Sequence, residues 1–198
     1  MPQGTLFIIS APSGAGKSTI CRKLLGLRKD LRYSISCTTR EPRPGEKNGK
    51  HYFFVGKEEF KRKIARHEFL EWAVVHDHYY GTPRHYIEQT VKDGLNLILA
   101  IDVQGAAAIR RKMPDSCLIF VAPPSIEALR ERMAARRDPS DNIAKRLANS
   151  KSELSAVKSY DYLVVNDDLE KAVDQIDCII TAERLRVSRQ EIPALAAV

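Results

Sequence analysis

The stretch TLFIISAPSGAGKSTICRKLLG, residues 5–26, passes from an apolar run through a loop of small residues into a segment with helical spacing. The loop fits the phosphate-loop pattern G-x-x-x-x-G-K-[ST] at Gly16, Lys17 and Ser18, with Ala11 in place of the first glycine. A strand, such a loop and a helix in this order begin a parallel α/β unit. The stretch therefore favours an α/β fold in which backbone amides at a helix N-terminus hold an anion.

The residue types of this loop suit a triphosphate. Gly14 and Gly16 permit the backbone angles and the close approach that side chains would block. Ala11 preserves the loop if its φ stays negative. Lys17 can place a charge on the β- and γ-phosphates, and the Ser18 hydroxyl can bind Mg²⁺. The alternative is an ordinary strand–helix turn. The predicted triphosphate-binding residues are Ala11, Pro12, Ser13, Gly14, Ala15, Gly16, Lys17, Ser18 and Thr19.

Three further apolar runs, at residues 95–101, 118–122 and 162–165, are nearly continuous, as expected for strands that are covered on both faces. Segments of helical period accompany the runs at 18–25, 126–136, 142–158 and 169–189. This alternation predicts a parallel sheet flanked by helices. Asp102 follows one run, at the edge of the sheet where ligands bind, and it can either meet a ligand or cap the next helix.

Residues 33–80 do not follow this alternation of strands and helices. They contain short β-type segments, one helix near 57–66 and the turn-rich stretch REPRPGEKNGK. We predict a small mixed subdomain inserted after the first helix. Arg40 and Arg43 lie there among prolines, and two guanidinium groups on a stiff loop suit a monophosphate. Tyr52 and Tyr80 can each add a phenolic hydrogen bond. Taken alone, such arginines more often belong to a solvated face.

Composition restricts the partners. A chain of 198 residues predicts one compact unit, and its net charge of +7 favours an anionic partner: a nucleotide, a nucleic acid or a membrane surface. No apolar run reaches the length of a membrane span, and the N-terminus lacks the features of a signal peptide. The four scattered cysteines predict reduced thiols in a cytoplasmic protein, with no metal site.

Together these stretches resemble the bacterial guanylate kinases. The matching pieces occur in the order of that family: SAPSGAGKST, TTREPRPGEKNGKHYFF, FLEWAVVHDHYYGT, AIDVQGA, FVAPPS, KRL and YLVVNDD. The second piece separates this family from other nucleotide kinases. The resemblance implies the P-loop nucleoside-monophosphate-kinase fold over residues 4–187, followed by a tail at 188–198. Within this domain it implies a core (4–32, 83–124, 147–187), a GMP-binding insert (33–82) and a helical lid (125–146).

The resemblance also implies an activity and its residues: transfer of the γ-phosphoryl group of ATP to GMP or dGMP, with Mg²⁺ held through Ser18, and Asn166 as an adenine contact. Glu71 would accept the N1–H and N2–H₂ donors of guanine, while Ser36 and Thr82 would meet O6 and N7. The implied GMP-binding residues are Ser36, Arg40, Arg43, Tyr52, Glu71, Tyr80, Thr82 and Asp102. The implied catalytic residues are Lys17, Arg40, Arg132, Arg136 and Arg146. We expect no nucleic-acid or membrane partner, and the oligomeric state stays open.

Two positions depart from the family pattern. Ala100 stands where the family usually has an acidic residue, so Glu46 is a candidate to replace that carboxylate. The lid sequence ARRDPSDN lacks the usual glycine and gains Pro139, which should stiffen the turn. Two other functions remain open: a non-catalytic module of the same fold that binds phosphorylated peptides, and a kinase that acts on a phosphorylated sugar. The first would not need Lys17, and the second would not need Glu71.

Overall fold

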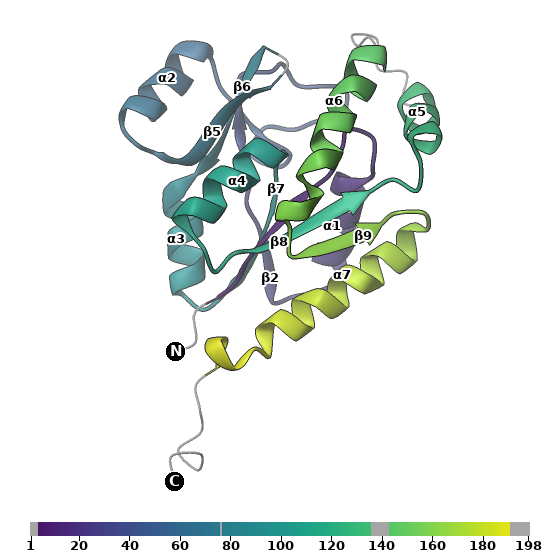
Figure 1. The fold of residues 1–198 in the computed structure, drawn as a ribbon. Coiled ribbons are helices and arrows are strands. Elements are labelled where there is room, and N and C mark those ends of the chain that lie inside the picture. The colour runs from purple at the N-terminus through teal and green to yellow at the C-terminus, as the bar shows by residue number, and fades with distance from the viewer. Residues whose placement is uncertain (1–3, 76, 136–142, 191–198) are drawn as a thin grey trace.

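The central feature of the fold is a five-stranded parallel sheet (Figure 1). The computed structural model describes residues 4–75, 77–135 and 143–190. The strand order is β2-β7-β1-β8-β9, so the strand that leads into the phosphate loop lies in the middle. The strands are β1 (Leu6–Ser10), β2 (Leu31–Tyr33), β7 (Asn96–Ala100), β8 (Cys117–Ala122) and β9 (Tyr162–Val165).

Helices cover both faces of this sheet, and the sequence of β1 shows why. Phe7 and Ile9 are fully buried in the cluster that contains residues of α1 (Lys17–Leu27), α5 (Ile126–Ala135) and α7 (Leu169–Arg184). Leu6 and Ile8 are buried on the opposite face, with residues of α3 (Arg84–Lys92) and α4 (Val103–Lys112). Successive side chains of a strand point to opposite faces, so a doubly covered strand is apolar throughout.

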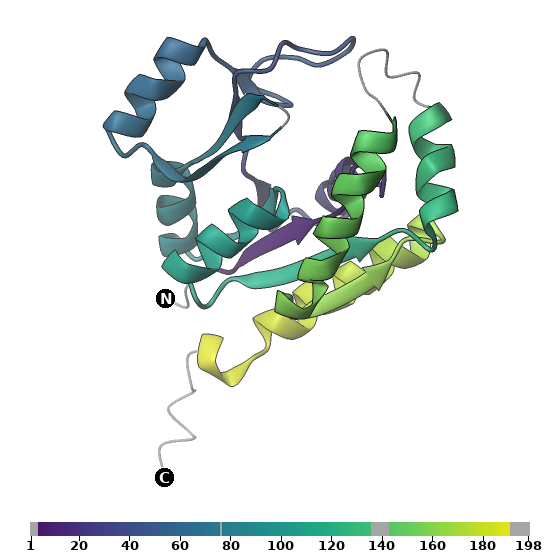
Figure 2. The same cartoon turned by 45° about the horizontal axis from the view of Figure 1, so that its top comes forward.

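The part of the chain between β2 and α3 forms a second, four-stranded sheet. Its order is β4-β3-β6-β5, made from β3 (Cys37–Thr38), β4 (Phe53–Phe54), β5 (Phe69–Val75) and β6 (His78–Pro83). Helix α2 (Lys57–Ala65) covers it through Phe60, whose ring stacks on Phe69 at a centroid distance of 4.5 Å. Figure 2 shows this small sheet on one side of the molecule and helix α6 (Ile143–Ser155) on the other.

The structure changes several predicted boundaries. Tyr33 pairs with Ile98 in the main sheet, so the small sheet begins later, at Cys37. The helix predicted over 142–158 ends at Ser155 and continues as a 3₁₀ turn, Ala156–Ser159. The helix predicted over 169–189 ends at Arg184, and another 3₁₀ turn, Val187–Arg189, begins one residue before the predicted tail and continues into it. Helices α3 and α4 were not among the predicted segments. The turn at 136–142 and residues 191–198 lie outside the described residues, and the division into core, insert and lid stays a prediction.

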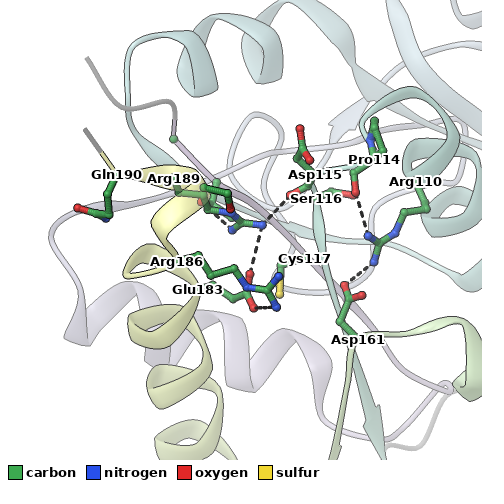
Figure 3. A pocket seen from close by; sticks show the side chains of 13 residues that line it. Arg110, Pro114, Asp115, Ser116, Cys117, Asp161, Glu183, Arg186, Arg189 and Gln190 are labelled. Carbon is green, nitrogen blue, oxygen red and sulfur yellow. Dashed lines mark hydrogen bonds and ion pairs between the residues drawn. The ribbon is translucent and has the colours of Figure 1, made fainter. Parts of the chain in front are cut away.

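A cavity of about 360 Å³ lies at the edge of the sheet where β1 and β8 begin (Figure 3). Its guanidinium groups are all paired: Arg110 with Asp161, and both Arg186 and Arg189 with the buried carboxylate of Glu183. Glu183 also accepts a hydrogen bond from the hydroxyl of Tyr162. These contacts fasten the end of α7 to the sheet. Among the described helices, none is long and apolar enough to cross a membrane.

Candidate active site

A cavity of about 240 Å³ lies where the strands of the main sheet end. Residues from the phosphate loop, the small sheet, the end of β7 and helix α6 line it, so it joins the two predicted anion sites. The predicted site residues that line this cavity are Ala11, Pro12, Ser13, Gly14, Gly16, Lys17, Ser18, Ser36, Arg43, Tyr52, Glu71, Tyr80 and Asp102.

The phosphate loop has the backbone that its sequence requires. Gly14 and Gly16 adopt φ values of 94° and 98°, in the left-handed region that favours glycine. Among the described non-glycine residues only His67 and Asp77 have positive φ, so Ala11 keeps a negative φ as expected. Helix α1 begins at Lys17, and its first amides are therefore open to an anion.

Asn166 supports this loop from behind. Its Nδ2 atom donates a hydrogen bond to the carbonyl oxygen of Ala15 at 2.7 Å, and the residue is buried. A Cβ atom on Gly16 would lie 2.4 Å from the same Nδ2 atom, so glycine is required there for space as well as for φ. The adenine contact implied for Asn166 stays a prediction, because the structure places its amide against the loop.

Arg40 is held in place by neighbours from three segments. Its Nη2 atom donates to both carboxylate oxygens of Glu46, at 3.0 and 2.9 Å, and its Nε atom donates to the hydroxyl of Tyr80 at 3.3 Å. The guanidinium also lies 5.5 Å from the centroid of the Tyr52 ring. Burial acts to lower the pKa of Arg40, but Glu46 and Tyr80 outweigh it and raise that pKa, so the cation is strongly favoured.

Glu46 also accepts a hydrogen bond from the backbone N–H of Arg43 at 2.8 Å. One carboxylate therefore orients the side chain of Arg40 and the backbone of Arg43. This geometry supports the role expected of Glu46 in the absence of an acid at Ala100, which lines the cavity.

Glu71 brings a buried carboxylate into the cavity from β5. Its Oε1 atom accepts a hydrogen bond of 2.5 Å from the Thr82 hydroxyl on the paired strand β6. Burial raises the pKa of Glu71 to about 7, although the bond from Thr82 opposes that shift. Ser36 also lines the cavity, whereas Thr82 is fully buried and does not line it.

Asp102 caps helix α4. Its Oδ1 atom accepts from the backbone N–H groups of Gln104 and Gly105, at 2.8 and 3.0 Å. This is the capping alternative that the sequence left open, and the residue also lines the cavity. One oxygen is thus committed to the helix, and a direct contact of the other with substrate stays a prediction.

Sequence reasoning missed Glu153, a carboxylate from α6 that lines the cavity. Burial raises its pKa to about 7; the ammonium of Lys17 opposes that shift and Asp102 adds to it. Burial also lowers the pKa of Lys17, whose Nζ donates to the carbonyl oxygen of Ile101 at 2.8 Å. A glutamate in an amphipathic helix resembles any solvated carboxylate, so only the position of α6 shows that Glu153 belongs to the site.

Comparison with known proteins decides the family. A guanylate kinase family model matches residues 3–183. A guanylate kinase of Caldanaerobacter subterraneus subsp. tengcongensis is 50% identical over 190 residues, which cover 96% of this chain and 92% of the relative. The chain belongs to the guanylate kinase family.

Other guanylate kinases agree with this assignment. The enzyme of Escherichia coli strain K12 is 51% identical over 194 residues, covering 96% of this chain and 94% of that protein. The crystal structure of a guanylate kinase from Anaplasma phagocytophilum superposes with a TM-score of 0.83 at 37% identity, over 98% of this chain and 93% of that one. The predicted fold and the predicted family are therefore confirmed.

The structure describes part of the predicted lid. Arg132 on α5 donates a hydrogen bond of 2.9 Å to the backbone carbonyl oxygen of Asn166. Arg136 and the side chain of Arg146 lie outside the described part of the chain, so their implied catalytic roles stay predictions. The predicted residues Ala15, Thr19, Arg40, Thr82, Arg132 and Asn166 do not line the cavity.

The donor set of this guanylate kinase site fits Mg²⁺ bound mainly through phosphates. Within residues 4–75, 77–135 and 143–190, no three His, Cys, Asp or Glu side chains form a group that could hold a metal. Mg²⁺ usually keeps several waters and takes only one or two protein ligands beside the substrate phosphates. The exposed hydroxyl of Ser18 in the cavity matches that requirement.

Proposed function

We propose that the cavity binds ATP at the phosphate loop and GMP at the small sheet, with the two phosphate ends facing each other. The reaction is transfer of the γ-phosphoryl group of ATP to GMP, which gives ADP and GDP. The observation that carries this proposal is the single cavity lined by Lys17 of the phosphate loop together with Arg43, Tyr52 and Glu71 of the insert.

In this proposal the guanine edge lies against Glu71 and Ser36. An ionised Glu71 would accept the N1–H and N2–H₂ donors of guanine, whereas adenine offers an acceptor at N1 and no amino group at C2. An adenine base would therefore leave buried groups without partners, which supports discrimination of about 10⁴-fold. Because none of these contacts uses the ribose 2′-hydroxyl, we propose dGMP as a second acceptor.

The GMP phosphate lies against Arg43, Tyr52 and Tyr80. Arg40 is oriented by Glu46 and Tyr80, and its guanidinium adds positive charge to the same region. A phosphate oxygen of GMP is already a nucleophile, so no side chain has to remove a proton. The protein contributes position and charge, which dominate phosphoryl transfer.

Transfer forms a bond between this oxygen and the γ-phosphorus and breaks the bond to the β–γ bridging oxygen, whose electron pair leaves with ADP. Lys17 and the loop amides stabilise the charge that develops there, with Arg132, Arg136 and Arg146 of the lid as further cations. Mg²⁺, held through Ser18 and the phosphates, would neutralise negative charge on the β- and γ-phosphates. A cytoplasmic location and a role in GMP recycling stay predictions.

ADP release, coupled to a reporter reaction, tests the proposal with GMP, dGMP, AMP and ribose 5-phosphate as acceptors. We expect rapid turnover with GMP and dGMP and almost none with AMP. Turnover with ribose 5-phosphate alone would identify a sugar-phosphate kinase. GMP binding without any ADP release would indicate a binding module instead.

A further inference from the structure

The first turn of α4 lies directly against the Glu71 carboxylate. A Cβ atom built on Gly105 would lie 3.0 Å from Glu71 Oε2 and 3.1 Å from its Cδ. These separations are tighter than nine in ten real Cβ contacts, so a side chain at 105 would displace the carboxylate by a few tenths of an ångström; Ile101 Cδ1 lies 3.2 Å from the same Cβ position. Gly105 has an ordinary helical φ, which means that space rather than backbone conformation requires the glycine.

The carboxylate has little freedom to move away from Gly105. Its Oε1 atom is held by the Thr82 hydroxyl, and the residue is only 6% exposed. Helix α4 is fixed as well: the Asp102 cap holds its first turn at the backbone N–H of Gly105, and Lys112 donates a hydrogen bond to the Leu70 carbonyl oxygen next to Glu71. The carboxylate thus lies between two fixed neighbours.

We propose that Gly105 is a specificity-determining positioning residue, which leaves the space that the Glu71 carboxylate needs to face the N1–H and N2–H₂ edge of guanine. The inference rests on the function proposed above for Glu71. It extends base recognition to helix α4, none of whose residues touches the base in that proposal.

A pair of Gly→Ala substitutions tests it. Gly105→Ala adds a methyl group at the carboxylate, whereas Gly26→Ala adds the same group to α1, where nothing lies within 4 Å of the new Cβ. For Gly105→Ala we expect the KM for GMP to rise about tenfold and the KM for ATP to change less than twofold, because a small displacement spoils hydrogen-bond alignment. Gly26→Ala should leave both unchanged.

Inosine monophosphate, which lacks the 2-amino group, gives a readout that a general loss of stability would not move. The preference for GMP over inosine monophosphate, measured as a ratio of kcat/KM values, should narrow several-fold in Gly105→Ala and stay constant in Gly26→Ala. An unchanged KM for GMP or an unchanged preference in Gly105→Ala would overturn the inference.

The double variant Gly105→Ala/Glu71→Ala distinguishes a failure of this inference from a failure of the proposed function. If Gly105 acts through Glu71, Gly105→Ala adds no further rise in the KM for GMP when Glu71 is already alanine. A further rise would overturn the inference while leaving the role of Glu71 intact. If Glu71→Ala alone leaves the KM unchanged, the proposed recognition fails and the inference fails with it.

Folding of the single variant does not limit the test. If the added methyl group prevents Gly105→Ala from folding, the double variant Gly105→Ala/Glu71→Ala should recover the midpoint of thermal unfolding of Glu71→Ala. It lacks the collision with the carboxylate and keeps only the contact of the methyl group with Ile101 Cδ1, at 3.2 Å. A double variant that stays unfolded would show that the glycine serves another contact, and the inference would be wrong.

Discussion

The ammonium of Lys17 donates a hydrogen bond to the carbonyl oxygen of Ile101, 2.8 Å away at the end of the neighbouring strand β7. The cation is therefore fixed against the main sheet, at the phosphate-loop end of the cavity. Burial lowers its pKa, so a phosphate group that reaches it meets a poorly hydrated charge. In the proposed function, this arrangement separates the chemistry of transfer from the binding of GMP on the small sheet.

Lys17→Ala should lower kcat by about 10²- to 10³-fold, the usual cost of removing one preorganised donor from a transition state. The dissociation constant for GMP, measured by calorimetry, should change less than threefold. Lys23→Ala is the matched control, because Lys23 lies on the same helix and pairs with Glu170 at the surface. Equal losses of turnover and GMP affinity would contradict the division into two sites.

Glu71 should make GMP binding depend on pH. In the free protein its pKa is raised to about 7, so the carboxyl group is mostly protonated at pH 6 and ionised at pH 8. Guanine needs the ionised form, and binding therefore releases a proton and tightens about tenfold as pH rises from 6 to 8. Calorimetry in buffers with different ionisation enthalpies measures this proton release.

Two variants isolate the source of that dependence. Glu71→Gln should bind GMP more weakly. Its GMP affinity should keep only the pH dependence that comes from ionisation of the GMP phosphate, which the wild-type protein also shows. Glu153→Gln should retain the wild-type slope, although Glu153 also has a pKa of about 7. If the slope disappears in Glu153→Gln instead, the titrating group is on helix α6.

Glu46→Ala should weaken binding of the GMP phosphate without changing the contacts to the guanine base. Removing this carboxylate frees the guanidinium of Arg40 and the backbone of Arg43, so we expect the KM for GMP to rise about 10- to 100-fold and kcat to fall. Glu41→Ala is the control, since Arg40 contacts only the backbone carbonyl of that exposed residue. If the KM for GMP is unchanged in Glu46→Ala, Glu46 does not replace the acidic residue that the family usually has at position 100.

Glu183→Ala should destabilise the protein without changing the chemistry. The substitution leaves the Tyr162 hydroxyl and two guanidinium groups without their carboxylate, at a cost of about 2–4 kcal/mol because Glu183 is buried. The midpoint of thermal unfolding should fall by roughly 5–15 °C. Activity at 25 °C should persist, because this network lies at the opposite edge of the sheet from the cavity.

A surface pair provides the comparison for that experiment. Glu170→Ala removes an exposed partner of Lys23, and such pairs contribute about 0–1 kcal/mol. A similar effect of both substitutions on the unfolding midpoint would show that the Glu183 network contributes no more than a surface ion pair.

Patterns of several residues predicted the main sheet and the phosphate loop. Continuous apolar runs identified β1, β7 and β8, which are buried on both faces. The run of β9 also marked a strand, but the expected cover on both faces is wrong there, since Leu163 and Val165 are exposed at the end of the sheet. Strand β2 has only three residues, too few for a periodic signal, and its membership of the main sheet depends on pairing with Ile98. Helix α4 contains three alanines and a glycine, and the Asp102 cap that marks its start is visible only in the structure.

The site was predictable where a motif joins residues that are close in sequence. The loop from Ala11 to Ser18 and the arginines of the insert are examples. Interactions between distant residues were not predictable from spacing. The contacts of Asn166 with Ala15 and of Gly105 with Glu71, and the electrostatic interaction of Glu153 with Lys17, arise only after the sheet has formed. Single residues of these types occur at many positions that have no functional role, so the role of each one depends on the tertiary fold.

The contact between Gly16 and Asn166 has a consequence for how such a sequence can vary. Their positions are 150 residues apart, yet any side chain at 16 would occupy the space of the amide at 166. A larger residue in the loop would therefore require a smaller one at 166, and that change would in turn remove the hydrogen bond that holds Ala15. A side chain at 16 would thus need both a change at 166 and a backbone that tolerates the positive φ, whereas a change at 166 alone removes the hydrogen bond to Ala15 and leaves Gly16 its space.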